Sequence, residues 1–429
     1  MAGASQGSAP AIDRHRLGGG RTARFGPDTR PERPRLRIAG MRDHEDAMSQ
    51  AANRLARLLE RRPELVTVDG EAPEAAVIRR DQLLVGTSLA TRVAATIDRW
   101  VERREDVQGI GVTRLHLRGD ADVTDLLAGR LALPGGASAS PVHLFTAAPA
   151  HGGGPVGTPI VSQADTRRPP TTGAERLVQV ALLDTGLGPH DWFPAGSWDQ
   201  LGEGDVTDRS DVPTGPADDQ TGHGTFLAGV VRRHAPTARL VVGRVLASDG
   251  VCDEVELITA LHLLAARTPS SGRPVDVLVL GLGAFTWNDL RPAALARALL
   301  ALGSDTVVVA AAGNSGRERP FWPAALAPVV SVGALTAHGA RAGFSGHGCW
   351  VDAWAQGEDV TSSIVARGDE PAGQARWSGT SFAAARVSAQ IAHRAATTGY
   401  SAAAVTPQVL ADFAAPEPTD SPVPDGTSS

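Results

Sequence analysis

The sequence of 429 residues predicts an α/β protein built on a doubly wound, mainly parallel sheet, preceded by a small α+β sandwich domain. Two patterns lead to this class. From residue 177 onward, continuous apolar stretches alternate with helical patterns of about 10–15 residues, as in parallel sheets covered by helices on both faces. Between residues 76 and 147, shorter strand and helix patterns alternate ahead of a segment rich in Pro, Gly and Thr.

The N-terminal part divides by composition. Residues 1–40 are rich in Arg, Gly and Pro, and we expect a disordered tail, with a nucleic-acid arm as the alternative. Residues 41–75 carry one helical apolar face and a connector. Domain 76–147 is expected to contain strands at 76–78, 83–85, 110–117 and 141–145, and helices at 87–103 and 121–132. Residues 148–176 follow as a linker.

The region 177–400 carries the stronger periodicity. Apolar runs predict strands at 177–183, 240–245, 275–282, 307–312 and 329–332. Helical patterns cover 223–234, 253–267 and 292–302, and a further helix begins near Ser381 and ends at Gly399. Residues 401–429 are expected to be a second disordered tail.

Four polar residues lie at the ends of these elements, where ligands bind in open parallel sheets. Asp184 and Asn314 follow buried strands, His223 stands between two glycines at a helix start, and Ser381 begins a helix. Each residue alone also has a structural explanation: a turn cap, a packed histidine, a left-handed turn residue and a helix N-cap. Their common position makes a nucleophile, a base and an oxyanion donor the stronger interpretation.

The order Asp184, His223, Asn314, Ser381 resembles the subtilisin-like serine proteases, the subtilases. The resemblance rests on four motifs that cover roughly half of the chain: A-L-L-D-T-G at 181–186, T-G-H-G-T at 221–225, A-A-G-N-S-G at 311–316 and S-G-T-S-F-A-A at 378–384. It implies a sheet of the subtilisin type over residues 177–400.

The resemblance also implies roles for individual residues. Ser381 would be the nucleophile, His223 its general base, and Asp184 the carboxylate that orients the imidazole. Asn314 would donate to the oxyanion. An extended peptide or protein substrate would bind along residues aligned beside the site, namely Gly250, Leu282, Gly283, Ala312 and Gly313.

Three positions depart from the family pattern: Phe226 replaces a second His, Gly281 a frequent Ser, and Ala385 a Pro. None of them removes a catalytic residue. The leading hypothesis is therefore a serine endopeptidase. A catalytically silent peptide-binding module and an esterase or acyl transferase on the same machinery are the alternatives.

Residues 76–147 have the size and position of the propeptide that many subtilases carry. Pro141–Phe145 would then be the strand that blocks the substrate site. A retained regulatory or partner-binding domain is the alternative, because no motif decides between them.

Composition limits the remaining hypotheses. The net charge of −6 gives no reason to expect nucleic acid or an anionic membrane as partner. No apolar run reaches the ~18 residues of a membrane span, and no signal-peptide core is seen, so the default expectation is a cytoplasmic monomer, with export left open. Cys252 and Cys349 make no disulfide framework. We expect no cofactor and no catalytic metal; structural calcium in the acidic segment Asp199–Asp219 is an idea that no ligand spacing supports.

Overall fold

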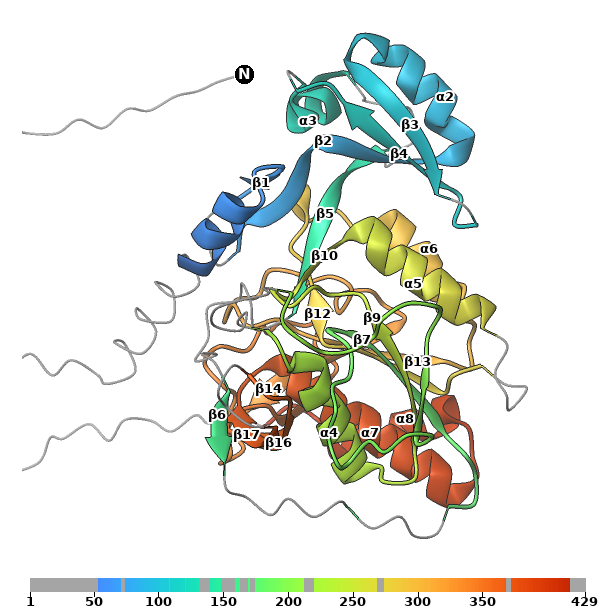
Figure 1. Cartoon of the computed structure of the whole chain (residues 1–429), viewed down its shortest axis with the longest axis vertical. Helices are drawn as coiled ribbons and strands as arrows, with labels where there is room; N and C mark the ends of the chain where they lie inside the picture. Colours follow the sequence, from blue (N-terminus) through green and yellow to red (C-terminus); the bar gives the residue numbers. More distant parts are fainter. Residues whose placement is uncertain are drawn as a thin grey trace, which may run out of the picture. The chain divides into compact units, whose positions relative to one another are not determined.

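The computed structural model describes residues 53–70, 74–107, 109–119, 121–130, 139–147, 159–162, 169, 174–211, 220–267, 274–367 and 372–416 (Figure 1). All of them belong to one compact unit, residues 40–429. The tail expected at 1–40, most of the linker expected at 148–176 and residues 417–429 lie outside the described residues.

The C-terminal region contains the expected parallel sheet. Its strands are β7 (Gln179–Asp184), β8 (Trp198–Gln200), β9 (Arg239–Arg244), β11 (Val277–Leu280), β13 (Val307–Ala311), β14 (Val329–Leu335) and β15 (Ala353–Gln356). Within the described residues they form one sheet in the order β15–β14–β13–β11–β7–β9–β8, and all neighbours are parallel. The predicted fold class is confirmed.

Helices cover both faces of this sheet (Figure 1). Val180 and Leu182 of β7 share a core with α4 (His223–His234) and α7 (Thr380–Thr398). The intervening residues Ala181 and Leu183 point the other way and share a core with α5 (Glu254–Ala266) and α6 (Ala293–Leu300). Because successive side chains of a strand alternate between faces, a strand buried on both faces is continuously apolar, which explains why its sequence was easy to recognise.

The N-terminal region is an antiparallel sheet with helices. It contains β1 (Leu65–Val68), β2 (Ala76–Gly86), β3 (Val101–Val107), β4 (Val112–Leu117) and β5 (Ala139–Ala147). All pairings among these strands are antiparallel. A helix at 53–61 precedes them, α2 (Thr87–Thr96) follows β2, and α3 (Val123–Asp125) continues into a π-helical turn, Leu126–Arg130. The expected α+β organisation is confirmed.

Two details of the prediction for this region were wrong. The helix expected at 87–103 ends at Thr96, and its last residues begin strand β3. That strand reads VERREDV and lies at the edge of the sheet, where polar side chains face water and the apolar alternation is lost. The two strands expected at 76–78 and 83–85 are one strand, β2, whose pairing with β5 shifts register between Ile78 and Leu83.

Strand β5 joins the N-terminal sheet to the C-terminal region. It pairs antiparallel with β10 (Val251–Asp253) and with β12 (Leu282–Gly283). Apolar residues of β5, among them Phe145 and Ala147, belong to the same core as Leu257 of α5. This strand therefore lies beside the loops that follow β9 and β11.

The C-terminal end of the chain holds two further elements. A small antiparallel sheet combines β16 (Val360–Ile364), β17 (Gly373–Trp377) and β6 (Ile160–Ser162), the last of which lies within the expected linker. Helix α8 (Ala402–Asp412) occupies most of the described part of the tail expected at 401–429, so that prediction was wrong for these residues. Ser401 caps the helix, and Val405 and Val409 are buried. None of the helices among the described residues is long and apolar enough to cross a membrane.

Candidate active site

Asp184 and His223 meet at the carboxyl end of β7. Asp184 is the last residue of that strand, and His223 is the first residue of α4. His223 Nδ1 lies 2.7 Å from Asp184 Oδ1, which also accepts the Thr185 N–H at 2.8 Å. Since a carboxylate only accepts hydrogen bonds, a neutral His223 carries its proton on Nδ1 and leaves Nε2 as an acceptor.

Ser381 faces that second ring nitrogen. Its Oγ lies 3.0 Å from His223 Nε2, so the hydroxyl donates to the imidazole. All three side chains are buried. Ser381 is the second residue of α7, where backbone N–H groups have no partner inside the helix and the helix dipole is positive. The arrangement can move a proton from Ser381 to His223 while Asp184 stabilises the resulting charge.

Asn314 places an amide donor beside the same helix. Its Oδ1 accepts both the N–H and the hydroxyl of Thr380 at 2.9 Å, which fixes the orientation of the amide. Its Nδ2 is buried and has no hydrogen-bond partner among the residues that the structure describes. A buried donor without a partner costs free energy, and it is what an oxyanion site needs before the charge develops.

The glycines around His223 have steric reasons. Gly222 has φ +93°, a backbone conformation that residues with a side chain rarely adopt. A Cβ on Gly224 would lie 2.3 Å from the carbonyl oxygen of Gly186, in the turn that follows Asp184. Close contact between these two turns brings His223 within reach of Asp184.

Asp208 is a buried carboxylate that the sequence did not single out as part of the site. Its Oδ1 accepts the Gly222 N–H, and its Oδ2 accepts the N–H and the hydroxyl of Thr225. It thereby binds the first turn of α4 on both sides of His223. Burial raises the pKa of Asp208, whereas the hydrogen bonds from Thr225 and Gly222 lower it. The only signal in the sequence was its position in the acidic segment Asp199–Asp219.

Strand β5 occupies the positions where the sequence predicts substrate. Ala147 N–H donates to the carbonyl oxygen of Gly250 at 2.7 Å, and Ala147 pairs with Leu282. Thr146 pairs with Gly283. Three predicted substrate-binding residues thus form two backbone edges with an extended strand between them. This is the geometry of β-strand addition.

The other two predicted substrate-binding residues lie next to Asn314. Ala312 follows the last residue of β13 and donates its N–H to the carbonyl oxygen of Val332. Gly313 has φ +85°, and a Cβ there would lie 2.9 Å from the ring of Phe321. Asp184, Leu282 and Asn314 thus lie at or just beyond the carboxyl ends of β7, β11 and β13, and His223 and Ser381 begin the helices α4 and α7.

Comparison with known proteins gives the same answer as the motifs. The model of the subtilase family matches residues 175–412, which is more than half of the chain. The chain belongs to the subtilase family. It is 33% identical over 180 residues to the thermophilic serine proteinase of Bacillus sp., covering 39% of this chain and 41% of that protein. It is 32% identical over 200 residues to subtilisin BL of Lederbergia lenta, covering 43% and 66%.

Another similar protein is subtilisin-like protease 2 of Pseudogymnoascus destructans, 31% identical over 204 residues, with 46% of this chain and 48% of that protein covered. The matched segment thus spans less than half the length of two of these three subtilases. The family match and the parallel sheet confirm the family resemblance and the fold class that the sequence predicts.

The departures from the subtilase pattern have local consequences. Phe226 is fully buried and packs against Phe382 and Trp377, with ring centroids 4.4 and 5.7 Å away. Gly281 lets the backbone approach the catalytic side chains closely: a Cβ there would lie 3.2 Å from Asp184 Oδ2, which is buried and has no hydrogen-bond partner among the described residues. Ala385 is buried inside the unbroken helix α7.

The acidic segment considered for calcium makes other contacts where the structure describes it. Asp199 forms ion pairs with Arg239 and Arg267, and Asp211 with Arg244. Among the described residues no group of three or more His, Cys, Asp or Glu side chains is placed to hold a metal ion. Residues 212–219 lie outside the described residues.

Cys252 lies in β10 beside the substrate-like strand, and its side chain is buried. Burial raises the pKa of the Cys252 thiol, and the charges of Glu256 and Asp253 raise it further. A thiol without its thiolate form is a poor nucleophile. Cys252 therefore acts as a small packing residue.

Proposed function

We propose that the chain is a serine endopeptidase that hydrolyses peptide bonds through an acyl-enzyme on Ser381. One observation carries this proposal: the hydrogen bonds from Ser381 to His223 and from His223 to Asp184 are continuous, and beside them lies Asn314 Nδ2, a donor with no partner among the described residues. The subtilase family to which the chain belongs supports the same reaction.

In the proposed reaction Ser381 Oγ attacks the substrate carbonyl carbon as its proton passes to His223 Nε2. Asp184 holds the Nδ1 proton and stabilises the imidazolium. Asn314 Nδ2 and the Ser381 N–H donate to the oxyanion, and losing one such donor costs about 3–4 kcal/mol of transition-state stabilisation. His223 then gives its proton to the leaving amine. Water then attacks the acyl carbon as its proton passes to His223. The ester bond to Ser381 Oγ breaks, and His223 returns the proton to Ser381.

The proposed substrate is an extended segment of a protein. It would take the place of β5 between β10 and β12, pairing with the backbone of Gly250, Leu282 and Gly283. Ala312 and Gly313, next to the oxyanion donor, would contact the residue before the cleaved bond. Every group in this reaction is supplied by the protein, so we propose no cofactor and no catalytic metal.

For residues 76–147 we propose the role of a propeptide that blocks the site through β5. Pairing of β5 with both backbone edges supports this role, because substrate and β5 cannot occupy the same edges. A retained regulatory or partner-binding domain is the competing hypothesis for these residues. Mass spectrometry of the incubated protein separates them: an intact chain with full activity would contradict removal of a propeptide.

The test of the reaction is labelling with a fluorophosphonate together with cleavage of a protein substrate. We expect Ser381 to be labelled after incubation, and Ser381→Ala to lose both labelling and cleavage. Ser88→Ala, an exposed serine of the N-terminal region, is the matched control and should keep both. Cleavage that persists in Ser381→Ala would refute the mechanism. Cleavage of esters but not of peptides would favour an esterase. A monomeric state and a cytoplasmic location stay predictions.

A further inference from the structure

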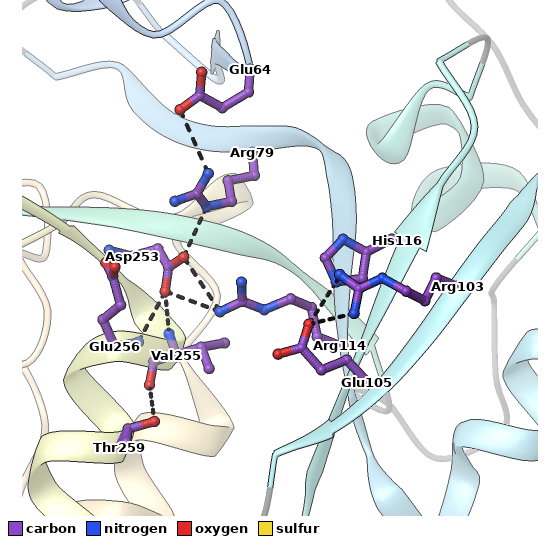
Figure 2. A network of polar contacts seen from close by, with 10 residues as sticks. All are labelled: Glu64, Arg79, Arg103, Glu105, Arg114, His116, Asp253, Val255, Glu256 and Thr259. Atoms are coloured by element: carbon purple, nitrogen blue, oxygen red, sulfur yellow. Dashed lines mark hydrogen bonds and ion pairs between the residues drawn. The ribbon is translucent and has the colours of Figure 1, made fainter.

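The first turn of α5 carries three carboxylates whose partners come from the N-terminal region. We call Asp253, Glu254 and Glu256 the acidic turn. Figure 2 shows Arg79 and Arg114 reaching Asp253 from strands β2 and β4. Arg79 Nε lies 2.9 Å from Asp253 Oδ2, and Arg114 Nη2 lies 3.4 Å from both carboxylate oxygens.

Asp253 has a structural role as well, which explains part of this cluster. It is the N-cap of α5, where its Oδ1 accepts the N–H groups of Val255 and Glu256. The Glu256 side chain in turn accepts the Asp253 N–H, which completes a capping box. A capping box needs an acceptor side chain at the N-cap and a Glu or Gln three residues later. It therefore explains neither Glu254 nor the negative charge of Glu256.

Glu254 points at the strand that occupies the substrate position. Its side chain is fully buried, and its Oε2 lies 3.2 Å from Nδ1 of His143 in β5. The Trp287 N–H donates to His143 Nε2, so Nδ1 carries the proton of a neutral ring. Within the described part of the chain, one neutral hydrogen bond thus reaches the Glu254 carboxylate, and its Oε1 is buried without a partner. A buried, ionised carboxylate with one hydrogen bond costs folding free energy unless a cation pairs with it.

The negative charge of the acidic turn is therefore balanced by side chains from residues 76–147, which precede the subtilase match at 175–412. Among the described residues Asp253 forms ion pairs with Arg79 and Arg114, whereas Glu254 accepts a hydrogen bond from the neutral ring of His143. Burial raises the pKa of Glu256, as does the charge of Asp253, whereas Arg79 and Arg114 lower it. If residues 76–147 leave, the acidic turn loses its contacts with Arg79, Arg114 and His143 at once and keeps those of the capping box.

A strand in the place of β5 presents alternate side chains to this surface. Asp253 pairs with Leu144, and the neighbouring position 143 faces Glu254. Positions 143, 145 and 147 lie on one face because side chains alternate along a strand. Phe145 and Ala147 of that face belong to the core shared with α5, which leaves position 143 for the charged contact.

We infer that the acidic turn is a substrate subsite for a basic side chain, held at the position of His143, four residues before that of Ala147. In the full chain Arg79 and Arg114 supply the positive charge that the substrate's cation would bring, and His143 takes the position of its side chain. This inference rests on the proposed endopeptidase function and names one feature of its substrates. Arginine and lysine satisfy Glu254 better than a neutral imidazole, because a charged donor makes the stronger hydrogen bond.

The first experiment measures cleavage by the incubated full chain. Quenched peptides carry X-Leu-Phe-Thr-Ala followed by five randomised residues, with Arg, Gln or Glu as X. We expect kcat/KM to be about tenfold higher for Arg than for Gln, and lowest for Glu. In the double variant Glu254→Gln, Glu256→Gln the ratio of Arg to Gln should fall to about one. Gln at position 256 keeps the capping box. Glu203→Gln, an exposed glutamate, is the matched control and should keep the native ratio.

The second experiment needs no catalysis and is made in full-length Ser381→Ala protein. Arg79 and Arg114 are 16% and 15% exposed, so replacing both with Gln opens the acidic turn to solvent. We expect this protein to bind hexa-arginine about tenfold more tightly than the control Arg92→Gln, Arg118→Gln, which loses the same charge at exposed sites. Adding Glu256→Gln should remove most of the gain. Circular dichroism checks folding, and Arg114→Gln alone is the milder variant.

The outcomes separate the two proposals. Equal cleavage of the Arg and Gln peptides would overturn the subsite while leaving the endopeptidase intact. Equal affinity for hexa-arginine in the opened and control proteins would also overturn it. Tight binding of hexa-arginine by a chain that cuts no peptide would support a basic-peptide site and refute the proposed catalysis.

Discussion

Replacing Gly281 tests whether the second oxygen of Asp184 is as isolated as the structure shows. Asp184 Oδ1 accepts two hydrogen bonds, from His223 and Thr185, whereas Oδ2 is buried and accepts none from the described residues. A Cβ on Gly281 would lie 2.7 Å from Cδ2 of Leu227, and 3.2 Å from both Asp184 Oδ2 and His223 Cε1. A serine hydroxyl at this position would extend one bond further and could donate to the carboxylate.

Two effects of opposite sign decide the result. The added Cβ is too close to Leu227, and crowding of this kind costs about 1–3 kcal/mol, although the end of a leucine side chain can move. A hydrogen bond to a charged group contributes about 1.5–3 kcal/mol. Gly281→Ala carries the crowding without the hydroxyl. We therefore expect Gly281→Ser to exceed Gly281→Ala by about 1.5–3 kcal/mol in free energy of unfolding, and to lie near the native protein.

The assay is urea denaturation of both variants in Ser381→Ala protein, which avoids self-digestion. Tryptophan fluorescence and circular dichroism should give the same midpoint for each protein. In the active background, cleavage rates of one quenched peptide show whether Ser at position 281 also supports catalysis better than Ala. Equal unfolding free energies for the Ser and Ala variants would refute the reasoning, because they would mean that Asp184 Oδ2 gains nothing from a donor.

Three further predictions concern other parts of the site and its surroundings. Asn314→Asp keeps an acceptor for Thr380 but loses the amide donor, so kcat should fall about 10²–10³-fold with little change in thermal stability; an unchanged kcat would exclude Asn314 as an oxyanion donor. Asp208→Ala removes the acceptor of three buried donors, and urea denaturation should show a loss of about 2–5 kcal/mol, against less than about 0.5 kcal/mol for exposed Asp191→Ala. Burial lowers the pKa of His234 from 6.5 to about 4, so the unfolded chain binds more protons in that window and the free energy of unfolding should decrease as the pH falls through it. His234→Gln should flatten this pH dependence, and an unchanged slope would contradict it.

The parallel sheet could be predicted because its physics is local. Strands such as Val277–Leu280 are buried on both faces and read as continuous apolar runs, and the helices between them repeat every 3.6 residues. Strand β3 and helix α8 lacked such signals. The first is a polar edge strand, and the second has only two buried valines and an internal proline in a stretch of tail-like composition.

In the candidate site, too, some residues could be predicted from local sequence patterns and others could not. Asp184, His223, Asn314 and Ser381 each lie in a short motif, and the structure brings them together. The sequence offered no comparable pattern for Asp208, because its three donors come from residues 14 and 17 positions away along the chain. The acidic turn reads as an ordinary start of a helix, and its arginine partners are 139 and 174 residues away. Contacts at such distances depend on the tertiary fold and leave no periodic trace.

The chain between β5 and β6 has a consequence for how the proposed inhibition would depend on concentration. β5 pairs with β10 and β12, whereas β6 pairs with β17, immediately before the Ser381 motif. While β5 is covalently tethered to the rest of the chain, it competes with substrate as an intramolecular ligand, whose effective concentration does not fall on dilution. Once that tether is cut, the same strand competes only at its bulk concentration. Dilution of the cleaved protein would then favour dissociation of the strand and activate the proposed enzyme, whereas a high protein concentration would maintain the inhibition.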